Sequence, residues 1–102
     1  GTVLNDHMES RVLLEVCGKD VPVVSTKGYT GHMLGAAGAT EAVFVVAALE
    51  QGWIPISLGA LPLDSNIEIR VNTDSYECFC RHAMSTSFAF GGSNAAVVLS
   101  RT

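Results

Sequence analysis

The sequence predicts a layered α/β/α fold in which a core helix covers a mixed sheet. Residues 34–51 are apolar nearly all round, as expected for a helix that is covered on most sides. Two strand-like stretches, 83–88 and 95–100, flank a glycine-rich loop, and the second is apolar at successive positions, so both of its faces need cover. Together, these apolar surfaces need more packing partners than one small domain can provide. We therefore expect further packing from a missing half or a large dimer interface.

The first expected element is an amphipathic helix. Apolar residues recur every four positions from Met8 to Val16, Asp6 and Glu9 have the spacing of a capping box, and Gly18 is placed to end the helix.

Residues 21–26 predict a strand, because the β-branched pair Val23 and Val24 suits a buried pleat and a proline near the start costs only one donor. The polar, glycine-bearing residues 27–32 then predict a loop. This loop leads into the core helix, which Gly52 is placed to end.

The second half of the chain predicts short strands and loops. A strand over 54–58 precedes an irregular stretch around Pro62, which we expect to be a surface loop. The strands 83–88 and 95–100 are expected to pair in antiparallel fashion across a six-residue loop, 89–94.

Composition excludes several classes of function. The formal net charge is −4, and the six basic residues form no cluster, so nucleic acid is not an expected partner. The most apolar run, 42–49, is far shorter than the roughly 20 residues that cross a bilayer, so no membrane segment and no signal peptide are expected. Three irregularly spaced cysteines, Cys17, Cys78 and Cys80, argue for a reducing compartment, and we expect the cytoplasm.

A lysine and a histidine are the first candidates for chemistry. Lys27 and His32 lie five positions apart, just before a helix start that is rich in small residues. An imidazole there could donate a hydrogen bond to a developing oxyanion, and a nearby ammonium could organise it. Simple close packing is the alternative. Phosphate binding fits poorly, because Gly31, Gly35 and Gly38 match neither the dinucleotide nor the Walker spacing.

Three runs of residues then point to one family. Residues 25–41, STKGYTGHMLGAAGATE, closely resemble the lysine/histidine signature of β-ketoacyl-acyl-carrier-protein synthases. Residues 88–94, FAFGGSN, resemble the family's C-terminal Phe-Gly-Phe-Gly-Gly-Thr-Asn loop, and residues 1–6 resemble the end of its His-Gly-Thr-Gly-Thr-x-Leu-x-Asp motif. All three occur in the family's order. Residues 1–102 therefore resemble the C-terminal portion of such a synthase domain, without the N-terminal half that holds the nucleophilic cysteine.

The resemblance implies a thiolase-like fold, a homodimer, and an active site built from one cysteine and two histidines. His32 matches the second histidine, which helps to bind the extender thioester carbonyl and stabilises the enolate formed on decarboxylation. Lys27 matches the lysine that supports this site, and Glu41 matches its acidic partner. The first histidine is expected just before Gly1.

The glycine loop carries the other implied roles. Phe90 matches the gating phenylalanine, whose backbone N–H joins that of the nucleophile in an oxyanion hole, while Gly91 and Gly92 let the loop move. Two residues depart from the family pattern: Ala89 replaces a usual glycine and Ser93 a usual threonine. These departures leave the subfamily open.

The implied reaction is a decarboxylating Claisen condensation of an enzyme-bound acyl group with malonyl-acyl-carrier protein, in fatty-acid or polyketide synthesis. Neither a cofactor nor a metal is expected, because the substrates are carried on the phosphopantetheine of acyl carrier protein, the expected partner. Residues 1–102 alone are expected to be inactive. Two alternatives are a non-catalytic partner subunit of the chain-length-factor type and a purely structural α/β module.

The remaining polar residues have simpler expected roles. Cys78, Cys80 and His82 alternate, so they could begin a metal site, but a fourth ligand is lacking and packing is expected. Asp64 is expected in a solvated loop with no catalytic role. Tyr29 could touch the pocket or serve as a structural hydroxyl.

Overall fold

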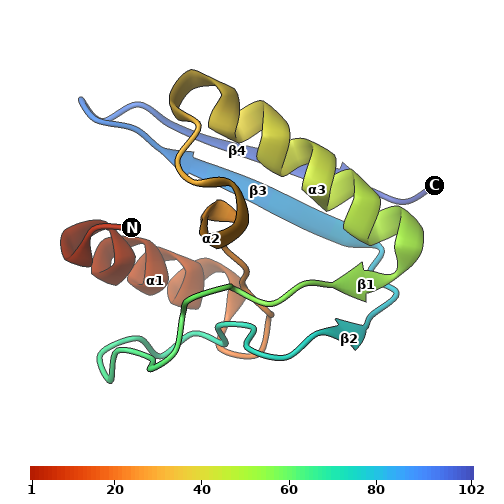
Figure 1. The fold of residues 1–102 in the computed structure, drawn as a ribbon, viewed down its shortest axis with the longest axis horizontal. Helices are drawn as coiled ribbons and strands as arrows, with labels where there is room; N and C mark the ends of the chain where they lie inside the picture. Colours follow the sequence, from red (N-terminus) through yellow and green to blue (C-terminus); the bar gives the residue numbers. More distant parts are fainter. The chain divides into compact units, whose positions relative to one another are not determined.

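The computed structural model describes residues 1–102, and the chain is α/β as predicted. It divides into two units: residues 1–29 with 56–74, and residues 30–55 with 75–102. In chain order (Figure 1), the elements are α1 (Val3–Cys17), α2 (Lys27–Thr30), the 3-10 turn η1 (Leu34–Ala36), α3 (Ala37–Gln51), β1 (Trp53–Ile54), β2 (Tyr76–Glu77), β3 (His82–Phe88) and β4 (Asn94–Ser100).

Helix α1 of the first unit begins earlier than the sequence suggested. Thr2 is its N-cap, and the Thr2 hydroxyl accepts a hydrogen bond of 3.2 Å from the Asn5 N–H. The predicted cap at Asp6 is therefore wrong: this carboxylate lies in the first turn, where it faces the positive end of the helix dipole. The predicted end at Gly18 is confirmed, since its N–H donates to the Leu14 carbonyl at 3.0 Å.

The predicted strand over residues 21–26 is wrong except at one residue. Val23 forms an isolated parallel bridge with Val71. Its N–H donates to the Arg70 carbonyl at 2.9 Å, and its carbonyl accepts from the Asn72 N–H at 2.8 Å. β-branched residues favour an extended backbone, but a strand also needs a partner segment that runs beside it. Here the segment around Val71 pairs with Val23 only.

Helix α3 of the second unit confirms a helix in the predicted stretch, although it begins at Ala37 after the turn η1 and only Leu49 in it is buried. It packs along the β3–β4 hairpin (Figure 1). Gly52 ends it in the left-handed region at φ 66°, as predicted. Strands β3 and β4 pair in antiparallel register from His82 with Ser100 to Phe88 with Asn94, which confirms the hairpin. The loop is one residue shorter than predicted, because Asn94 belongs to the ladder.

The helix runs antiparallel to β3. At its start, a Cβ added to Gly38 would lie 3.4 Å from Ser87 Oγ, near the end of β3. At its end, the Gly52 carbonyl accepts a hydrogen bond of 2.9 Å from the Cys78 N–H, in the segment before β3. The first turn of α3 and the β3–β4 loop therefore lie at one end of this unit.

The sheets of the chain are small. Strands β1 and β2 pair in antiparallel fashion at Trp53 with Glu77 and Ile54 with Tyr76, so the predicted strand over 54–58 is shorter than expected. With β3–β4 and the parallel bridge in the first unit, both strand orientations of a mixed sheet are present, but not as one continuous sheet.

Much of the apolar surface is exposed in this chain. Leu13 and Leu49 are its only buried hydrophobic side chains, whereas Val43 on α3 is 65% exposed and Val98 on β4 is 63% exposed. These are the surfaces for which the sequence predicted further cover.

The stretch 34–51, with a mean hydropathy of 1.2, is long and apolar enough to cross a membrane by length and composition alone. Core helices of soluble proteins meet the same criterion, and here α3 packs along a hairpin.

Candidate active site

The predicted site residues fall in both units. Lys27 is the first residue of α2, in the first unit. The others belong to the second unit: His32 lies in the turn before η1, Glu41 lies within α3, and Phe90, Gly91 and Gly92 lie in the β3–β4 loop.

A hydrogen bond from the backbone of Leu34 holds the His32 ring and selects one neutral tautomer. The Leu34 N–H donates a hydrogen bond of 3.0 Å to His32 Nδ1. Because a backbone amide can only donate, Nδ1 must be an acceptor, and the neutral ring carries its proton on Nε2. The exposed imidazole therefore presents an N–H donor at its outer edge.

The donor of this hydrogen bond, Leu34, also has an unusual backbone conformation. Leu34 has φ 51°, in the left-handed region that residues with side chains seldom occupy. Strained residues of this kind cluster at functional sites, where the surrounding structure holds them in place.

Lys27 is anchored through the residues that follow it. A Cβ on Gly28 would clash with the backbone carbonyl of Leu58, so α2 approaches this segment as closely as glycine allows. The Tyr29 hydroxyl donates a hydrogen bond of 3.0 Å to the Ile56 carbonyl, which gives Tyr29 a structural role.

Both ionic residues of the predicted pair are half-buried. Glu41 is the fifth residue of α3, and Lys27 begins α2 in the other unit. Their pairing stays a prediction.

Phe90 stands at the tip of the β3–β4 loop with 99% of its surface exposed. Below it the loop is closed by two hydrogen bonds, from the Ala89 N–H to the Ser93 carbonyl at 2.9 Å and from the Gly92 N–H to the Ala89 carbonyl at 3.3 Å. Gly91 and Gly92 both have positive φ, 85° and 83°, which explains the need for glycine at both positions. The ring of Phe90 thus projects from a tight turn.

The structure brings two of the predicted segments to one end of the second unit. Gly38, in the first turn of α3, lies close to Ser87, near the end of β3. Phe88 is the last residue of β3, and the loop follows it. In the sequence, His32 precedes the start of α3 by five residues, and Phe90 follows Ser87 by three. An imidazole N–H and the amides of a glycine loop are the kinds of donor that stabilise an oxyanion.

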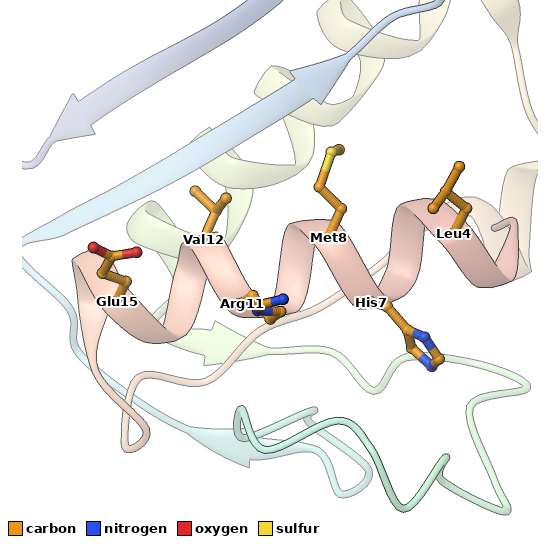
Figure 2. Close-up of a pocket in the computed structure, with 6 residues that line it drawn as sticks. All are labelled: Leu4, His7, Met8, Arg11, Val12 and Glu15. Atoms are coloured by element: carbon orange, nitrogen blue, oxygen red, sulfur yellow. The ribbon is translucent and has the colours of Figure 1, made fainter.

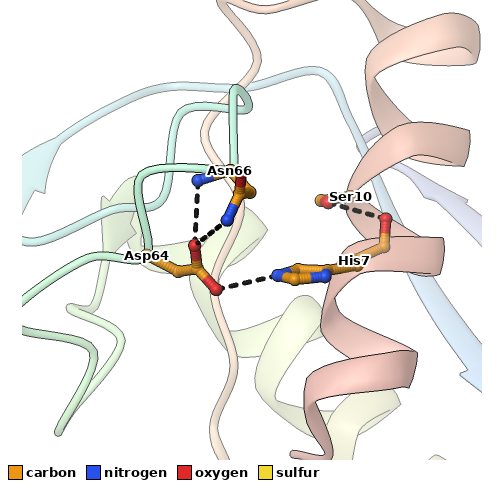
Figure 3. A network of polar contacts seen from close by, with 4 residues as sticks. All are labelled: His7, Ser10, Asp64 and Asn66. Atoms are coloured by element: carbon orange, nitrogen blue, oxygen red, sulfur yellow. Dashed lines mark hydrogen bonds and ion pairs between the residues drawn. The ribbon is translucent and has the colours of Figure 1, made fainter.

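A polar network that the sequence did not reveal lies in the first unit (Figure 3). His7 Nε2 lies 2.8 Å from Asp64 Oδ2, and Asp64 Oδ1 accepts from the backbone N–H and the side-chain amide of Asn66 at 2.8 and 3.0 Å. The backbone hydrogen bond from Asn66, followed by the one from His7, lowers the pKa of Asp64. Only the Asp64-x-Asn66 turn had a local signal, because His7 is 57 residues away.

A groove along α1 is separate from the predicted site (Figure 2). None of the predicted catalytic residues contributes to it. The groove is lined by side chains of this one helix: Leu4, His7, Met8, Arg11, Val12 and Glu15.

Comparison with known proteins supports the resemblance seen in the sequence. Residues 1–60 match the family described as "Beta-ketoacyl synthase, C-terminal domain". A mitochondrial 3-oxoacyl-[acyl-carrier-protein] synthase of Arabidopsis thaliana is 38% identical over 104 residues, which cover 95% of this chain and 23% of the relative. The 3-oxoacyl-[acyl-carrier-protein] synthase 1 of Escherichia coli K12 is 38% identical over 100 residues, with 96% and 25% coverage.

Solved structures agree in fold. "The ishigamide ketosynthase/chain length factor" matches all of this chain and 26% of its own, with a TM-score of 0.92 and 33% identity. A β-ketoacyl synthase from Burkholderia phymatum matches 95% of this chain and 24% of its own, with a TM-score of 0.85 and 31% identity. The chain spans about a quarter of the length of these relatives, and the predicted thiolase-like fold is confirmed. With its family match, its relatives and its fold in agreement, the chain belongs to the β-ketoacyl synthase family.

Proposed function

We propose that this chain supplies part of the active site of a decarboxylating condensing enzyme. The observation that carries the proposal is the hydrogen bond from the Leu34 N–H to His32 Nδ1, which leaves the neutral ring with its proton on Nε2. A donor fixed in this way is suited to a substrate oxygen that gains negative charge during the reaction.

In the proposed reaction, malonyl-acyl-carrier protein loses carbon dioxide and becomes a thioester enolate. The Nε2–H of His32 donates to the enolate oxygen and so lowers the free energy of the charged intermediate. The enolate carbon then attacks the acyl thioester on the nucleophilic cysteine, which lies outside this chain. A new carbon–carbon bond forms as the cysteine thiolate leaves, and the β-ketoacyl product stays on the carrier protein.

Lys27 and Glu41 are proposed to form an ion pair. Both side chains are half-buried, and a charge in such a setting is stabilised by an opposite charge nearby. The contacts of Gly28 and Tyr29 with the 56–58 segment would hold Lys27 in place for this pairing.

Phe90 is proposed to gate the acyl pocket. Its fully exposed ring stands on a backbone with two positive-φ glycines, so the loop can change direction while the β3–β4 ladder stays paired. In one position of the loop, the backbone N–H of Phe90 would complete the oxyanion hole for the acyl thioester.

A second candidate is a non-catalytic partner subunit of the chain-length-factor type. The observation that favours it is the TM-score of 0.92 to the structure titled "The ishigamide ketosynthase/chain length factor". The presence of Lys27, His32 and Glu41 favours the enzyme. The full-length sequence distinguishes the two, because the enzyme requires a cysteine nucleophile and a His-Gly-Thr run before Gly1. A partner subunit of the chain-length-factor type would lack the nucleophilic cysteine.

For the parent protein we propose a homodimer that works with acyl carrier protein in a reducing compartment such as the cytoplasm. The three free cysteines support a reducing compartment. Related proteins are named as mitochondrial and chloroplastic as well as bacterial, so the organelle depends on the source.

The proposal is tested by His32→Ala in the full-length protein. Because the substitution removes the donor to the enolate, release of carbon dioxide from malonyl-acyl-carrier protein should fall by about 10²-fold or more. Acylation of the nucleophile, followed by intact-protein mass spectrometry, should be affected much less. His7→Ala removes a histidine outside the site and is the matched control. An unchanged decarboxylation rate in His32→Ala would contradict the assigned role.

A further inference from the structure

Two thiols lie side by side in the segment that joins β2 to β3. Cys78 Sγ and Cys80 Sγ are 3.0 Å apart, and both cysteines are free. The Cys80 N–H donates to the Cys78 carbonyl at 3.0 Å, which closes a three-residue turn, and the Cys78 N–H donates to the Gly52 carbonyl at 2.9 Å. On the other side, the Arg101 N–H donates to the Arg81 carbonyl at 2.8 Å. The backbone thus holds the sulfur atoms together.

The spacing of the sulfur atoms suits a disulfide better than a metal ion. A disulfide bond of about 2.05 Å needs the sulfurs to approach by roughly 1 Å, which side-chain rotation within the turn can supply. Two thiolates on one tetrahedral zinc, with Zn–S bonds of about 2.3 Å, would stand roughly 3.8 Å apart and would need further ligands. His82 instead bonds Ser100 Oγ at 2.8 Å, and no three His, Cys, Asp or Glu side chains gather where they could hold a metal.

The two thiols are joined by a hydrogen bond. The hydrogen bond with Cys78, together with partial burial, raises the pKa of Cys80 to about 11, so Cys80 keeps its proton at neutral pH. Either sulfur can be the donor of this hydrogen bond, and a thiolate is the form that attacks an oxidant. Both cysteines are half-buried, and Phe79 between them is 71% exposed, so a small oxidant can reach the pair.

We propose that Cys78 and Cys80 form a redox-active dithiol that a peroxide converts to an intramolecular disulfide. The Cys78 thiolate attacks one peroxide oxygen, the O–O bond breaks, and with hydrogen peroxide a sulfenic acid and hydroxide form. Cys80 Sγ then attacks Cys78 Sγ and expels a second hydroxide. The two hydroxides take up the two thiol protons, so two thiols and one peroxide give one disulfide and two waters.

The resolving thiol is already in contact with the sulfur it attacks, so the disulfide should form before further oxidation to a sulfinic acid.

This dithiol is separate from the proposed condensation. The segment 78–81 leads into the first residue of β3, whereas the Phe90 loop follows the last residue of that strand. Oxidation of the pair can therefore be measured whether or not the protein catalyses condensation.

Peptide mapping of the full-length protein tests the proposal, because trypsin releases both thiols in one peptide, 71–81. The reduced protein is treated with hydrogen peroxide, alkylated with iodoacetamide, digested and analysed by mass spectrometry. In untreated protein the peptide should carry two alkyl groups. After peroxide treatment the peptide should carry no alkyl group and should have lost two hydrogens. Reduction with dithiothreitol before alkylation should restore the doubly alkylated peptide.

Three comparisons make the test specific. Cys17 lies alone in peptide 12–19 and should form no such product. Cys78→Ser and Cys80→Ser should each abolish the disulfide peptide, and the remaining thiol should instead reach the sulfinic acid at high peroxide. The proposal is overturned if peptide 71–81 stays doubly alkylated while Cys17 is oxidised. It is equally overturned if both cysteines become separate sulfinic acids, or if they cross-link two molecules on a non-reducing gel.

Discussion

At the scale of single residues, this protein shows how one hydrogen bond sets the chemistry of a side chain. The Leu34 amide selects the Nε2–H tautomer of His32, and the hydrogen bond with Cys78 raises the pKa of Cys80. Asp64 is a third case, since the amide of Asn66 favours its charged form. In each case a neighbouring donor or acceptor, and not the residue type alone, selects the tautomer or shifts the pKa.

The Asp64 network predicts a pH-dependent contact in the first unit. Because the folded pKa of Asp64 is lowered from 3.8, its contribution to stability is present above about pH 4 and is lost as the pH falls through the folded value. We expect the backbone amide resonance of Asn66 to titrate below pH 4. NMR titration of the full-length protein, or of a domain that retains this fold, measures this transition.

Asp64→Asn should abolish that transition at Asn66, whereas Glu68→Gln, a change in the same stretch outside the network, should leave it in place. A transition that persists in Asp64→Asn would show that another group controls the Asn66 amide.

At the scale of elements, close approach between segments positions the candidate site. Gly28 allows α2 to contact the Leu58 carbonyl, and the short distance between Gly38 and Ser87 sets the start of α3 against β3. The sequence indicated small residues in this region, and their use for close packing is confirmed at Gly28, whereas Gly38 lies at an ordinary contact distance from Ser87. Which backbone or side chain each glycine meets depends on segments distant in sequence.

Gly28→Ala should therefore destabilise the protein. The added methyl group would clash with the backbone carbonyl of Leu58, which cannot rotate away as a side chain can, and overpacking of this kind costs about 1–3 kcal/mol. Urea unfolding of the full-length protein measures the loss. Since Lys27 is adjacent, condensation activity should fall as well.

Gly35→Ala is the matched control for stability, because its methyl group would meet nothing within 4 Å. Equal free energies of unfolding for the two variants would show that the Gly28 contact with Leu58 is absent in solution.

At the scale of the whole molecule, the chain has too little core to account for its apolar surface. Two hydrophobic side chains are buried, and α3 and β4 expose several valines. The relatives are about four times as long as the matched segment, as 23% and 25% coverage of their lengths shows. The proposed active site likewise needs a nucleophile from outside these residues.

Residues 1–102 alone should neither form an acyl-enzyme nor condense acyl and malonyl thioesters. None of Cys17, Cys78 and Cys80 lies in the setting of the family's nucleophile, so incubation with an acyl-acyl-carrier protein should leave the mass of the chain unchanged. Intact-mass spectrometry gives the result, with the full-length protein as the positive control. Stoichiometric acylation of any of the three cysteines would refute the division of the site proposed above.

The sequence alone was enough to predict the features that depend on neighbouring residues. Helix α3, its end at Gly52 and the β3–β4 hairpin follow from apolar periodicity and glycine placement, and the motif residues identified the family. The strand expected at 21–26 and the cap expected at Asp6 failed, because each depended on a choice among competing partners.

Only the tertiary structure decided which distant groups meet. It joined His7 to Asp64, set Leu58 against Gly28 and tied Cys78 to Gly52. Local sequence patterns reflect interactions within one segment. These contacts depend instead on how separate segments pack and on which hydrogen-bond donors and acceptors each segment leaves available. That difference explains why the sequence could name the candidate site residues but not the hydrogen bonds that position them.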